Sequence, residues 1–429
     1  MGTASGGPSA SHECVITIDR LGGQGDGIAM AEGQTVYVAY GVPGDRLRIR
    51  LGKPRGQGLT AAILAVEQAG PARQKPPCAH FGRGGGCALQ HVDDALYAEW
   101  KRGRVVEALR QQGLGEVPVE PLVRTPAGSR RRITLAAQVA KGGAVLGFHA
   151  HESHYIVDLR ECHVMLPALA ALIAPLREML ARELRAGTKA EVMATVSATG
   201  IDLMVRADYQ PGRDSRVALA DFAGAQKLAR ISWQAGKEEP EPIALLRTPQ
   251  VLFGGVAVDP PPGAFLQASA EAEQAMIDLV AAAARGAKRV ADLYSGCGTF
   301  TFPLAKTAKV HAVEGDKDSL AALAAAARRG SLGRITSERR DLARNPLQPD
   351  ELKPFDCVVF DPPRAGAKAQ VEMLAKSRVP TVVAVSCDPG SFARDSRILV
   401  DSGYRLKSVT PIDQFVWSAH VEMVAVFRR

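Results

Sequence analysis

Residues 291–305, ADLYSGCGTFTFPLA, carry the pattern that decides the fold. A short apolar run leads into a loop with glycines at 296 and 298, and a helical stretch follows. Glycines at these positions let the backbone turn sharply and approach a ligand at the start of a helix. The third glycine of the G-x-G-x-x-G dinucleotide pattern is absent. The stretch therefore predicts a strand, a ligand-binding loop and a helix, without the dinucleotide fingerprint.

The same rhythm repeats from about residue 287. Strand-like pieces alternate with helical ones: KRVADLY, KVHAVEG, RITSERRDL, FDCVVFDPP and VPTVVAVSC. This alternation is typical of a parallel, doubly wound sheet, which binds ligands at the carboxyl ends of its strands. We therefore expect an α/β domain over residues 254–429, with its chemistry where these strands end.

Two further regions precede this domain. Residues 8–67 consist of short alternating strands with Gly and Pro turns, which predicts a small β-barrel. Residues 74–253 mix strand-like and helical pieces, which predicts an α+β domain. The period of a strand puts three arginines of RLRIRLGK on one face and three apolar residues on the other: Arg46, Arg48, Arg50 and Leu47, Ile49, Leu51. The arginine face is either a solvated surface or a contact for RNA phosphates.

Composition limits the class of protein. With 429 residues, 46% hydrophobic and 23% charged, the chain predicts a soluble protein of two or three domains without a membrane helix. The N-terminal sequence has no features of a secretory signal, and seven cysteines favour a reducing, cytoplasmic location. A formal net charge of +8 favours a polyanionic partner.

The first half of the expected site lies at the ends of the first three strands of this domain. Glu314 ends the strand after the glycine loop and is suited to accept hydrogen bonds from ribose hydroxyls. Together the loop and this acid resemble the S-adenosylmethionine site of class I methyltransferases. Asp341 ends the third strand, where such folds often bind adenine. Cys297 lies inside the loop and is expected to be a packing residue.

The second half lies at the ends of the later strands. DPPRAGA, residues 361–367, resembles the D-P-P-Y motif of amino-methyltransferases, but Arg364 replaces the aromatic residue. Cys387 follows the fifth strand, and Glu422 lies on the final one. C5 of uracil is too weak a nucleophile to attack a methyl sulfonium unaided, whereas thiolate addition at C6 makes C5 an enolate carbon. Cys387 fits the nucleophile, and Glu422 fits the base that removes the C5 proton.

The motifs FLQ, DLYSGCGTFTFPLA, VEG, DPPRAGA, SCDPGSFARD and HVEM together resemble the RNA uracil-5 methyltransferase family over nearly the whole chain. The resemblance implies a Rossmann-like methyltransferase domain with Cys387 as nucleophile and Glu422 as base. It also implies contacts to S-adenosylmethionine from six residues: Gln267, Tyr294, Thr299, Glu314, Asp341 and Asp361. Thr299 and Asp341 depart from the amides expected at those positions. Asp361 is also expected to face the substrate base, and Phe265 to stack on it.

The N-terminal barrel resembles the TRAM domain, an RNA-binding module of the OB type. Family members that combine it with a cysteine cluster act on 23S ribosomal RNA, so the resemblance implies this RNA as partner. The target uridine must leave its stack to reach the cysteine, which favours an unpaired site. We expect a monomer. The alternatives are a transfer-RNA uridine, C5 of an RNA cytosine, and a non-catalytic RNA-binding or assembly protein.

The stretch CAHFGRGGGCALQH, residues 78–91, contains two of the seven cysteines. The resemblance implies a [4Fe-4S] cluster held by C-x5-C-G-G-C and a later cysteine. Cys78, Cys87 and Cys162 match three of these ligands, whereas Gly84 occupies the second cysteine position. Three alternatives follow: a cluster with another fourth ligand, an incomplete [3Fe-4S] cluster, or a loop that has lost its metal.

Overall fold

The computed structural model describes residues 12–84, 86–140, 143–150 and 153–429. It divides into two compact units, one of Met1–Arg104 with Trp417–Ala419 and one of Val105–Val416 with His420–Arg429. Residues 8–11, where the barrel was expected to begin, lie outside the described residues. Helix α1 (Asp94–Gln111) runs through the division between the units.

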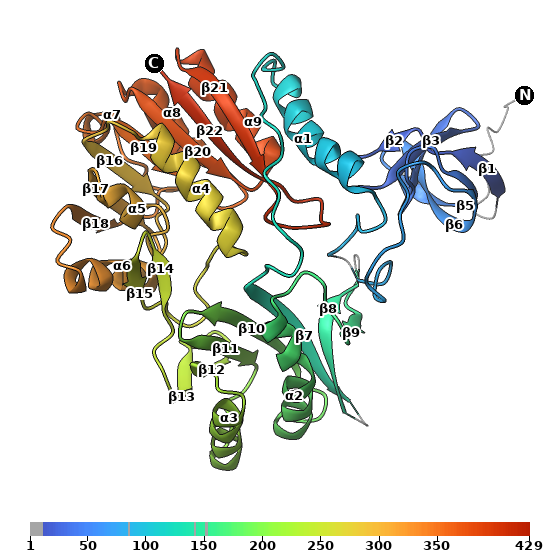
Figure 1. Ribbon diagram of the computed structural model, residues 1–429, viewed down its shortest axis with the longest axis horizontal. Coiled ribbons are helices and arrows are strands. Elements are labelled where there is room, and N and C mark those ends of the chain that lie inside the picture. Colours follow the sequence, from blue (N-terminus) through green and yellow to red (C-terminus); the bar gives the residue numbers. More distant parts are fainter. Residues whose placement is uncertain (1–11, 85, 141–142, 151–152) are drawn as a thin grey trace, which may run out of the picture. The chain divides into compact units, whose positions relative to one another are not determined.

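The first unit contains a six-stranded sheet in the order β1-β5-β6-β4-β3-β2 (Figure 1). Neighbouring strands are antiparallel except β4 and β6. The strands are β1 (Glu13–Thr17), β2 (Arg20–Leu21), β3 (Gly27–Ala31), β4 (Gln34–Val38), β5 (Arg46–Arg55) and β6 (Gly58–Gln68). In β5 the apolar residues Leu47, Ile49 and Leu51 are buried, and the three arginines that alternate with them are exposed. The predicted alternation is therefore confirmed for this strand.

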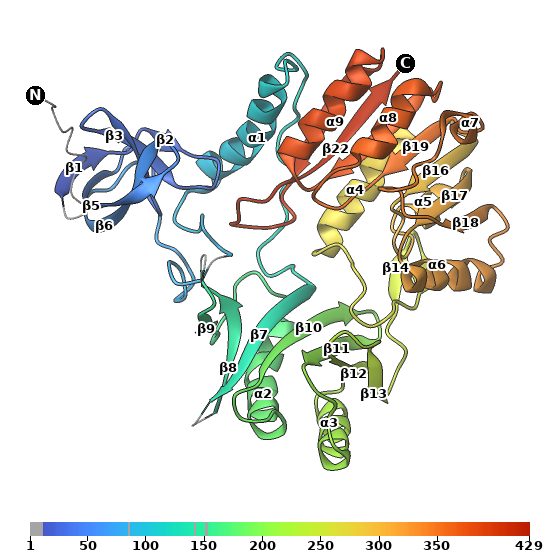
Figure 2. The same cartoon turned by 180° about the vertical axis from the view of Figure 1, so that it is seen from behind.

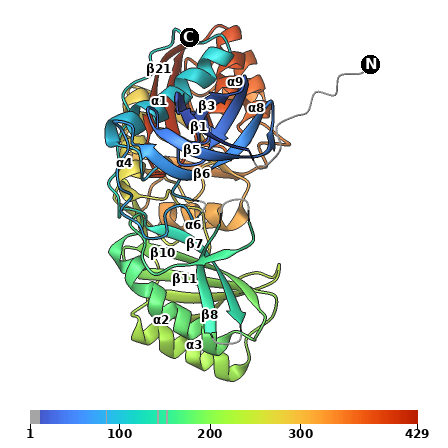
Figure 3. The ribbon, with the colours of Figure 1, turned by 90° about the vertical axis from the view of Figure 1, so that its right-hand side faces the viewer.

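The second unit begins with a seven-stranded sheet in the order β13-β12-β11-β10-β7-β8-β9. Helices α2 (Pro167–Glu183) and α3 (Arg213–Ala225) lie on the same face of it (Figure 3) and share its apolar core. The strands are β7 (Arg132–Ala140), β8 (Gly143–His149), β9 (Ile156–Asp158), β10 (Lys189–Ser197), β11 (Gly200–Ala207), β12 (Arg230–Ala235) and β13 (Glu241–Leu245). A hairpin of β14 (Val251–Phe253) and β15 (Val256–Val258) follows, so it spans the expected domain boundary at residue 254.

The last sheet has the order β18-β17-β16-β19-β20-β22-β21. Its strands are β16 (Arg289–Leu293), β17 (Lys309–Glu314), β18 (Ile335–Arg339), β19 (Cys357–Phe360), β20 (Thr381–Ser386), β21 (Arg405–Ile412) and β22 (Glu422–Arg428). The first five strands in this order, β18 to β20, are parallel to one another, as predicted. Strand β22, for which no direction was predicted, is antiparallel to both β20 and β21. Glu422 consequently begins its strand at the edge where the parallel strands end.

Helices cover both faces of this last sheet, as expected for a doubly wound domain. One face carries α4 (Ala270–Ala283), α5 (Thr301–Ala305) and α6 (Lys317–Arg329), of which α4 is prominent in Figure 1. The other carries α7 (Pro349–Leu352), α8 (Lys368–Lys376) and α9 (Pro389–Asp401), seen in Figure 2. Coverage on both faces explains why every residue of TVVAVS in β20 is buried. No helix within the described ranges is long and apolar enough to cross a membrane.

Candidate active site

The predicted cofactor residues come together because three neighbouring strands end at the same edge. Strand β16 lies between β17 and β19, and its last residue Leu293 pairs with Val313 and Phe360. Tyr294 therefore leaves the sheet between Glu314 and Asp361. The pairing of these strands brings together residues that are far apart in the sequence.

The glycine loop is fixed to the end of β17 by hydrogen bonds. Tyr294 has φ 59°, Gly296 has φ 53° and Gly298 has φ 102°, so the chain passes through the left-handed region three times in five residues. Such conformations are sparsely populated for a tyrosine and are found where the surrounding structure enforces them. The Gly296 amide donates to Oε2 of Glu314 (2.8 Å), and the Asp316 amide donates to Oε1 (2.8 Å). Glu314 thus holds the loop and retains further lone pairs for a ligand.

Acidic groups dominate the chemistry of this region. Asp292 is fully buried; it accepts a hydrogen bond from the Thr301 hydroxyl, and its Oδ1 has no hydrogen-bond partner among the described residues. Burial raises the pKa of Asp292 to about 7, and the negative charges of Asp361 and Glu314 add to this. Burial likewise raises the pKa of the Tyr294 hydroxyl to about 12, with further contributions from nearby acids. A cationic ligand would relieve this concentration of negative charge.

Two further predicted cofactor residues, Asp341 and Thr299, are less closely bound into this arrangement. Asp341 follows β18 and is exposed; its Oδ1 accepts the Ala343 amide (3.1 Å), and its charge contributes to the raised pKa of Tyr294. Thr299 lies half-buried in the glycine loop. Cys297 in the same loop is buried, and burial raises the pKa of its thiol to about 11, in keeping with the expected packing role.

Cys387 and Glu422 meet where β20 ends and β22 begins. The antiparallel register pairs Ser386 with Met423. Cys387, which follows Ser386, therefore lies opposite Glu422, which precedes Met423. Cys387 is partly exposed, whereas Glu422 is 4% exposed. Burial raises the pKa of the Cys387 thiol to about 12, and the charges of Glu422, Asp361 and Asp388 contribute in that order. The thiol is therefore protonated in the free protein.

A chain of side-chain amides links the carboxylates Asp361 and Glu422. Gln267 Nε2 donates to Asp361 Oδ2 (2.9 Å). Gln414 Nε2 donates to Gln267 Oε1 (2.8 Å) and to Glu422 Oε1 (3.2 Å). Gln414 was not predicted, because it lies in an irregular loop between β21 and β22 and belongs to none of the motifs quoted above.

The DPPRAGA loop is anchored on helix α9. The Ala367 amide donates to Asp395 Oδ2 (2.8 Å), and the Ser391 hydroxyl donates to the Arg364 carbonyl (3.0 Å). The Arg364 side chain is exposed and pairs with Asp388 (3.4 Å). These contacts fix the loop that begins with Asp361.

Phe265 lies near the catalytic edge with one face occupied. It is 65% exposed, and the Arg132 guanidinium lies 5.0 Å from the centre of its ring. A planar cation on one face leaves the other available for stacking.

The three predicted metal ligands belong to different units. Cys78 and Cys87 lie in the first unit and Cys162 in the second. No group of three or more His, Cys, Asp or Glu side chains in the described part of the chain is arranged to hold a metal ion. Since Gly84 cannot be a ligand either, these residues do not fit a four-cysteine cluster.

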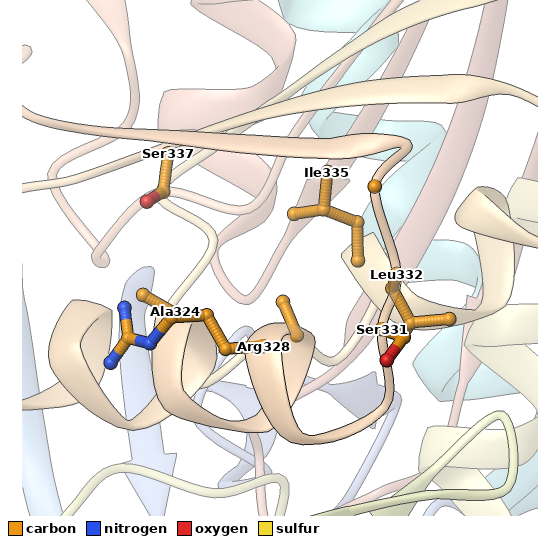
Figure 4. A pocket seen from close by; sticks show the side chains of 8 residues that line it. Ala324, Arg328, Ser331, Leu332, Ile335 and Ser337 are labelled. Carbon is orange, nitrogen blue, oxygen red and sulfur yellow. The ribbon is translucent and has the colours of Figure 1, made fainter.

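A hollow of about 400 Å³ lies away from the catalytic edge, between helix α6 and strand β18 (Figure 4). It is lined by Ala324, Ala327, Arg328, Ser331, Leu332, Gly333, Ile335 and Ser337. These residues belong to the end of α6, the turn after it and the first half of β18, which is the wrong end of the strand for a ligand of this fold. The hollow contains none of the predicted site residues.

Comparisons with known proteins agree with this geometry. The family model described as tRNA (Uracil-5-)-methyltransferase matches residues 258–429. An uncharacterized RNA methyltransferase of Mesorhizobium japonicum is 46% identical over 413 residues, covering 96% of this chain and 97% of that protein. A 23S rRNA (uracil(1939)-C(5))-methyltransferase of Chromohalobacter salexigens is 34% identical over 429 residues, covering 96% of this chain and 89% of that protein.

Among solved structures, the tRNA (uracil-54, C5)-methyltransferase of Pyrococcus abyssi in complex with S-adenosyl-L-homocysteine has a TM-score of 0.74 to this chain. Its sequence is 23% identical, and the match covers 96% of this chain and 99% of that one. At this level of identity the likeness concerns the fold alone.

Proposed function

The chain belongs to the RNA uracil-5-methyltransferase family, and from this premise we propose that it methylates C5 of a uridine in 23S ribosomal RNA through a covalent adduct with Cys387. One observation carries the proposal. The β20–β22 register brings a thiol and a buried carboxylate to adjacent positions at the catalytic edge. C5 methylation of a pyrimidine needs these two groups, one to activate C5 and one to release the product.

The proposed reaction starts at Cys387. Its thiol releases its proton to solvent, and the thiolate adds to C6 of uracil, so that the electrons of the C5–C6 double bond move into an enolate. C5 then forms a bond to the methyl group, which S-adenosylmethionine, when bound, would supply from its sulfonium, leaving a neutral thioether. Glu422 removes the proton from C5, the double bond re-forms, and the Cys387 sulfur leaves C6. The products are 5-methyluridine, S-adenosylhomocysteine and one proton.

S-adenosylmethionine, when bound, would supply an electrophilic methyl group on a positively charged sulfur. The described residues fit such a ligand, because Glu314 retains carboxylate lone pairs and buried Asp292 has an unpartnered oxygen. We propose that Gln267, Tyr294 and Glu314 form most of its binding site. Thr299, Asp341 and Asp361 complete the set expected from the family.

The RNA substrate is proposed from the relatives. The 23S enzyme of Chromohalobacter salexigens aligns with 96% of this chain. The family model and the Pyrococcus abyssi structure are named for transfer RNA, so a transfer-RNA uridine is the second candidate. Mass spectrometry of 23S ribosomal RNA and transfer RNA from a deletion strain distinguishes the two. Loss of 5-methyluridine from transfer RNA alone would contradict the ribosomal assignment.

We further propose three domains with residues 8–67 as a TRAM-like barrel, residues 74–253 as the central domain and residues 254–429 as the catalytic domain. The exposed arginines of β5 support an RNA role for the first. Two of them are already paired, Arg46 with Glu67 (3.2 Å) and Arg50 with Glu13 (2.9 Å). Phosphate groups would have to compete with these exposed carboxylates.

Two substitutions test the chemistry. Cys387→Ala should abolish methylation of 23S ribosomal RNA with cofactor binding within about threefold of the wild type. Glu422→Gln should accumulate a methylated covalent enzyme–RNA complex, because the C5 proton cannot leave. Cys14→Ala is the control, since this thiol lies in β1 of the first unit. Full activity of Cys387→Ala would rule out the covalent mechanism.

A further inference from the structure

The amide of Gln414 connects the two halves of the site. It is 3% exposed, and all three of its described hydrogen bonds go to the catalytic region. Its Oε1 accepts the Ala268 amide (2.9 Å), and its Nε2 donates to Gln267 and Glu422. Both hydrogens of its side-chain amide are therefore directed at protein acceptors.

The direction of the hydrogen-bond chain is set by one backbone group. A side-chain amide can be turned over, because its oxygen and nitrogen have nearly the same shape. The Ala268 N–H can only donate, so the atom of Gln414 that faces it must be the oxygen. The nitrogen of Gln414 then faces Gln267, which must present its own oxygen there. Gln267 is consequently left with its nitrogen directed at Asp361.

The backbone around Gln414 is also fixed. The Asp413 amide donates to the Val123 carbonyl (2.8 Å), and the Asp413 carbonyl accepts the Thr125 hydroxyl. The Val123 amide donates to the Pro411 carbonyl (2.9 Å). The backbone of Asp413, the residue before Gln414, is thus held by hydrogen bonds at both its amide and its carbonyl. These bonds fix the point from which the Gln414 side chain extends.

We propose that Gln414 is a positioning residue, whose amide holds Glu422 in place to remove the C5 proton and fixes the orientation of Gln267 toward Asp361. This inference rests on the proposed function, because it concerns the step assigned to Glu422. It assigns a role to a residue outside all of the sequence motifs. Gln414 acts through Glu422 and Gln267 and does not contact the reacting atoms.

The test is the lifetime of the covalent complex in a single turnover on a 23S ribosomal RNA transcript, measured on denaturing gels. Gln414→Met keeps the length of the side chain and removes the amide. We expect it to slow resolution of the complex about 10- to 100-fold, the effect of losing a hydrogen bond to a charged group. Formation of the complex should change less than about threefold. Gln414→Glu should slow resolution further, because it cannot donate and places a second carboxylate beside Glu422.

Gln370→Met is the matched control. Gln370 is also fully buried in the catalytic domain, but among the described residues its amide bonds only the backbone of Leu347 (2.8 and 3.1 Å). A general effect of losing a buried amide would lower the melting temperature of both methionine variants and prolong the complex in both. The proposal requires a prolonged complex in the Gln414 variants alone. Gln414→Glu keeps the volume of the side chain and an oxygen that accepts the Ala268 amide. It is therefore the variant to measure if Gln414→Met does not fold.

The outcomes separate this inference from the proposed function. A wild-type protein that forms no complex, or a Glu422→Gln variant that traps none, overturns the proposed function and the inference with it. Trapping by Glu422→Gln together with wild-type resolution in both Gln414 variants overturns the inference alone. Prolonged complexes in the Gln414 variants, with normal resolution in Gln370→Met, support it.

Discussion

Cys387 combines the accessibility of a nucleophile with the pKa of an inert thiol. With a pKa raised to about 12, roughly one thiol in ten thousand is ionised at pH 8. The carboxylates that raise it include Glu422, which the reaction also needs. In the free protein the thiol form of Cys387 is therefore favoured over the thiolate.

This gives a prediction about alkylation. Cys387 should react slowly with iodoacetamide at pH 8, and Glu422→Gln should speed its reaction about tenfold, because removing a neighbouring negative charge lowers the thiol pKa. Mass spectrometry of the labelled peptide measures the rate. Glu372→Gln, an exposed acid on α8, is the control. Equal rates in wild type and Glu422→Gln would show that the carboxylate does not act on the thiol.

Asp292 predicts a pH dependence of stability. Its pKa in the folded protein, about 7, lies above the ordinary value of 3.8. The protonated form therefore favours folding; this contribution is complete below about pH 4 and is lost as the pH rises through about 7. Asp292→Asn, neutral throughout, should match the wild type at pH 4 and be more stable by on the order of 2 to 4 kcal/mol at pH 8.

Urea unfolding at the two pH values measures this difference. Asp350→Asn is the control, because this side chain is 84% exposed. An Asp292→Asn variant that is no more stable than the wild type at pH 8 would mean that ionisation of Asp292 does not destabilise the folded protein.

At the scale of the elements, the sequence predicted the catalytic sheet well, because buried parallel strands have a strong local signature. Strand β20 is apolar along its whole length, and the glycine loop after β16 needs conformations that glycine supplies. Both signals lie within a few consecutive residues. The ends of these strands, and hence Glu314 and Asp361, could be located for the same reason.

The direction of β22 and the role of Gln414 could not be predicted in this way. The pattern of alternating apolar residues is the same for parallel and antiparallel strands, so the insertion of β22 between β20 and β21 depends on tertiary packing. Gln414 acts through partners 147 and 8 residues away in the chain. A buried glutamine in a loop has no local pattern that distinguishes it from an exposed one.

Iron binding by the cysteine loop, residues 78–91, can be tested by placing a cysteine at position 84. We expect less than about one iron per chain in anaerobically purified protein, because Gly84 replaces a ligand. A side chain added at Gly84 would meet no other atom within 4 Å, so Gly84→Cys should be tolerated. This variant completes the C-x5-C-x2-C spacing with Cys78 and Cys87, and it should bind more iron and sulfide per chain than the wild type.

Iron and sulfide analysis of both proteins, with visible absorption, checks the prediction. Gly23→Cys, another glycine of the first unit at which an added side chain would meet no atom within 4 Å, is the control for adventitious binding by a new thiol. A full cluster in the wild type would show that another group supplies the fourth ligand.

At the scale of the whole chain, Arg131 ties the central sheet of the second unit to the catalytic sheet. It lies just before β7, and its guanidinium forms a buried pair with Glu273 in α4 (2.6 Å). Its Nε also donates to the backbone carbonyl of Gln267 (3.1 Å), and its backbone amide donates to the carbonyl of Ala268 (2.8 Å). The segment with Gln267 and Ala268, which orients the amide chain of the active site, is therefore bonded directly to the central domain.

This connection predicts a large and non-additive effect on stability. Arg131→Met or Glu273→Leu alone should lower the free energy of unfolding by about 3 to 5 kcal/mol, because each leaves a charge buried without its partner. The double variant should be less destabilised than the sum of the two, since it buries no unpaired charge. Urea unfolding measures all three. Glu178→Gln, which breaks an exposed pair with Arg182, should cost less than about 1 kcal/mol. Losses that simply add would mean that the two charges do not interact, and that the catalytic segment is held by its backbone hydrogen bonds alone.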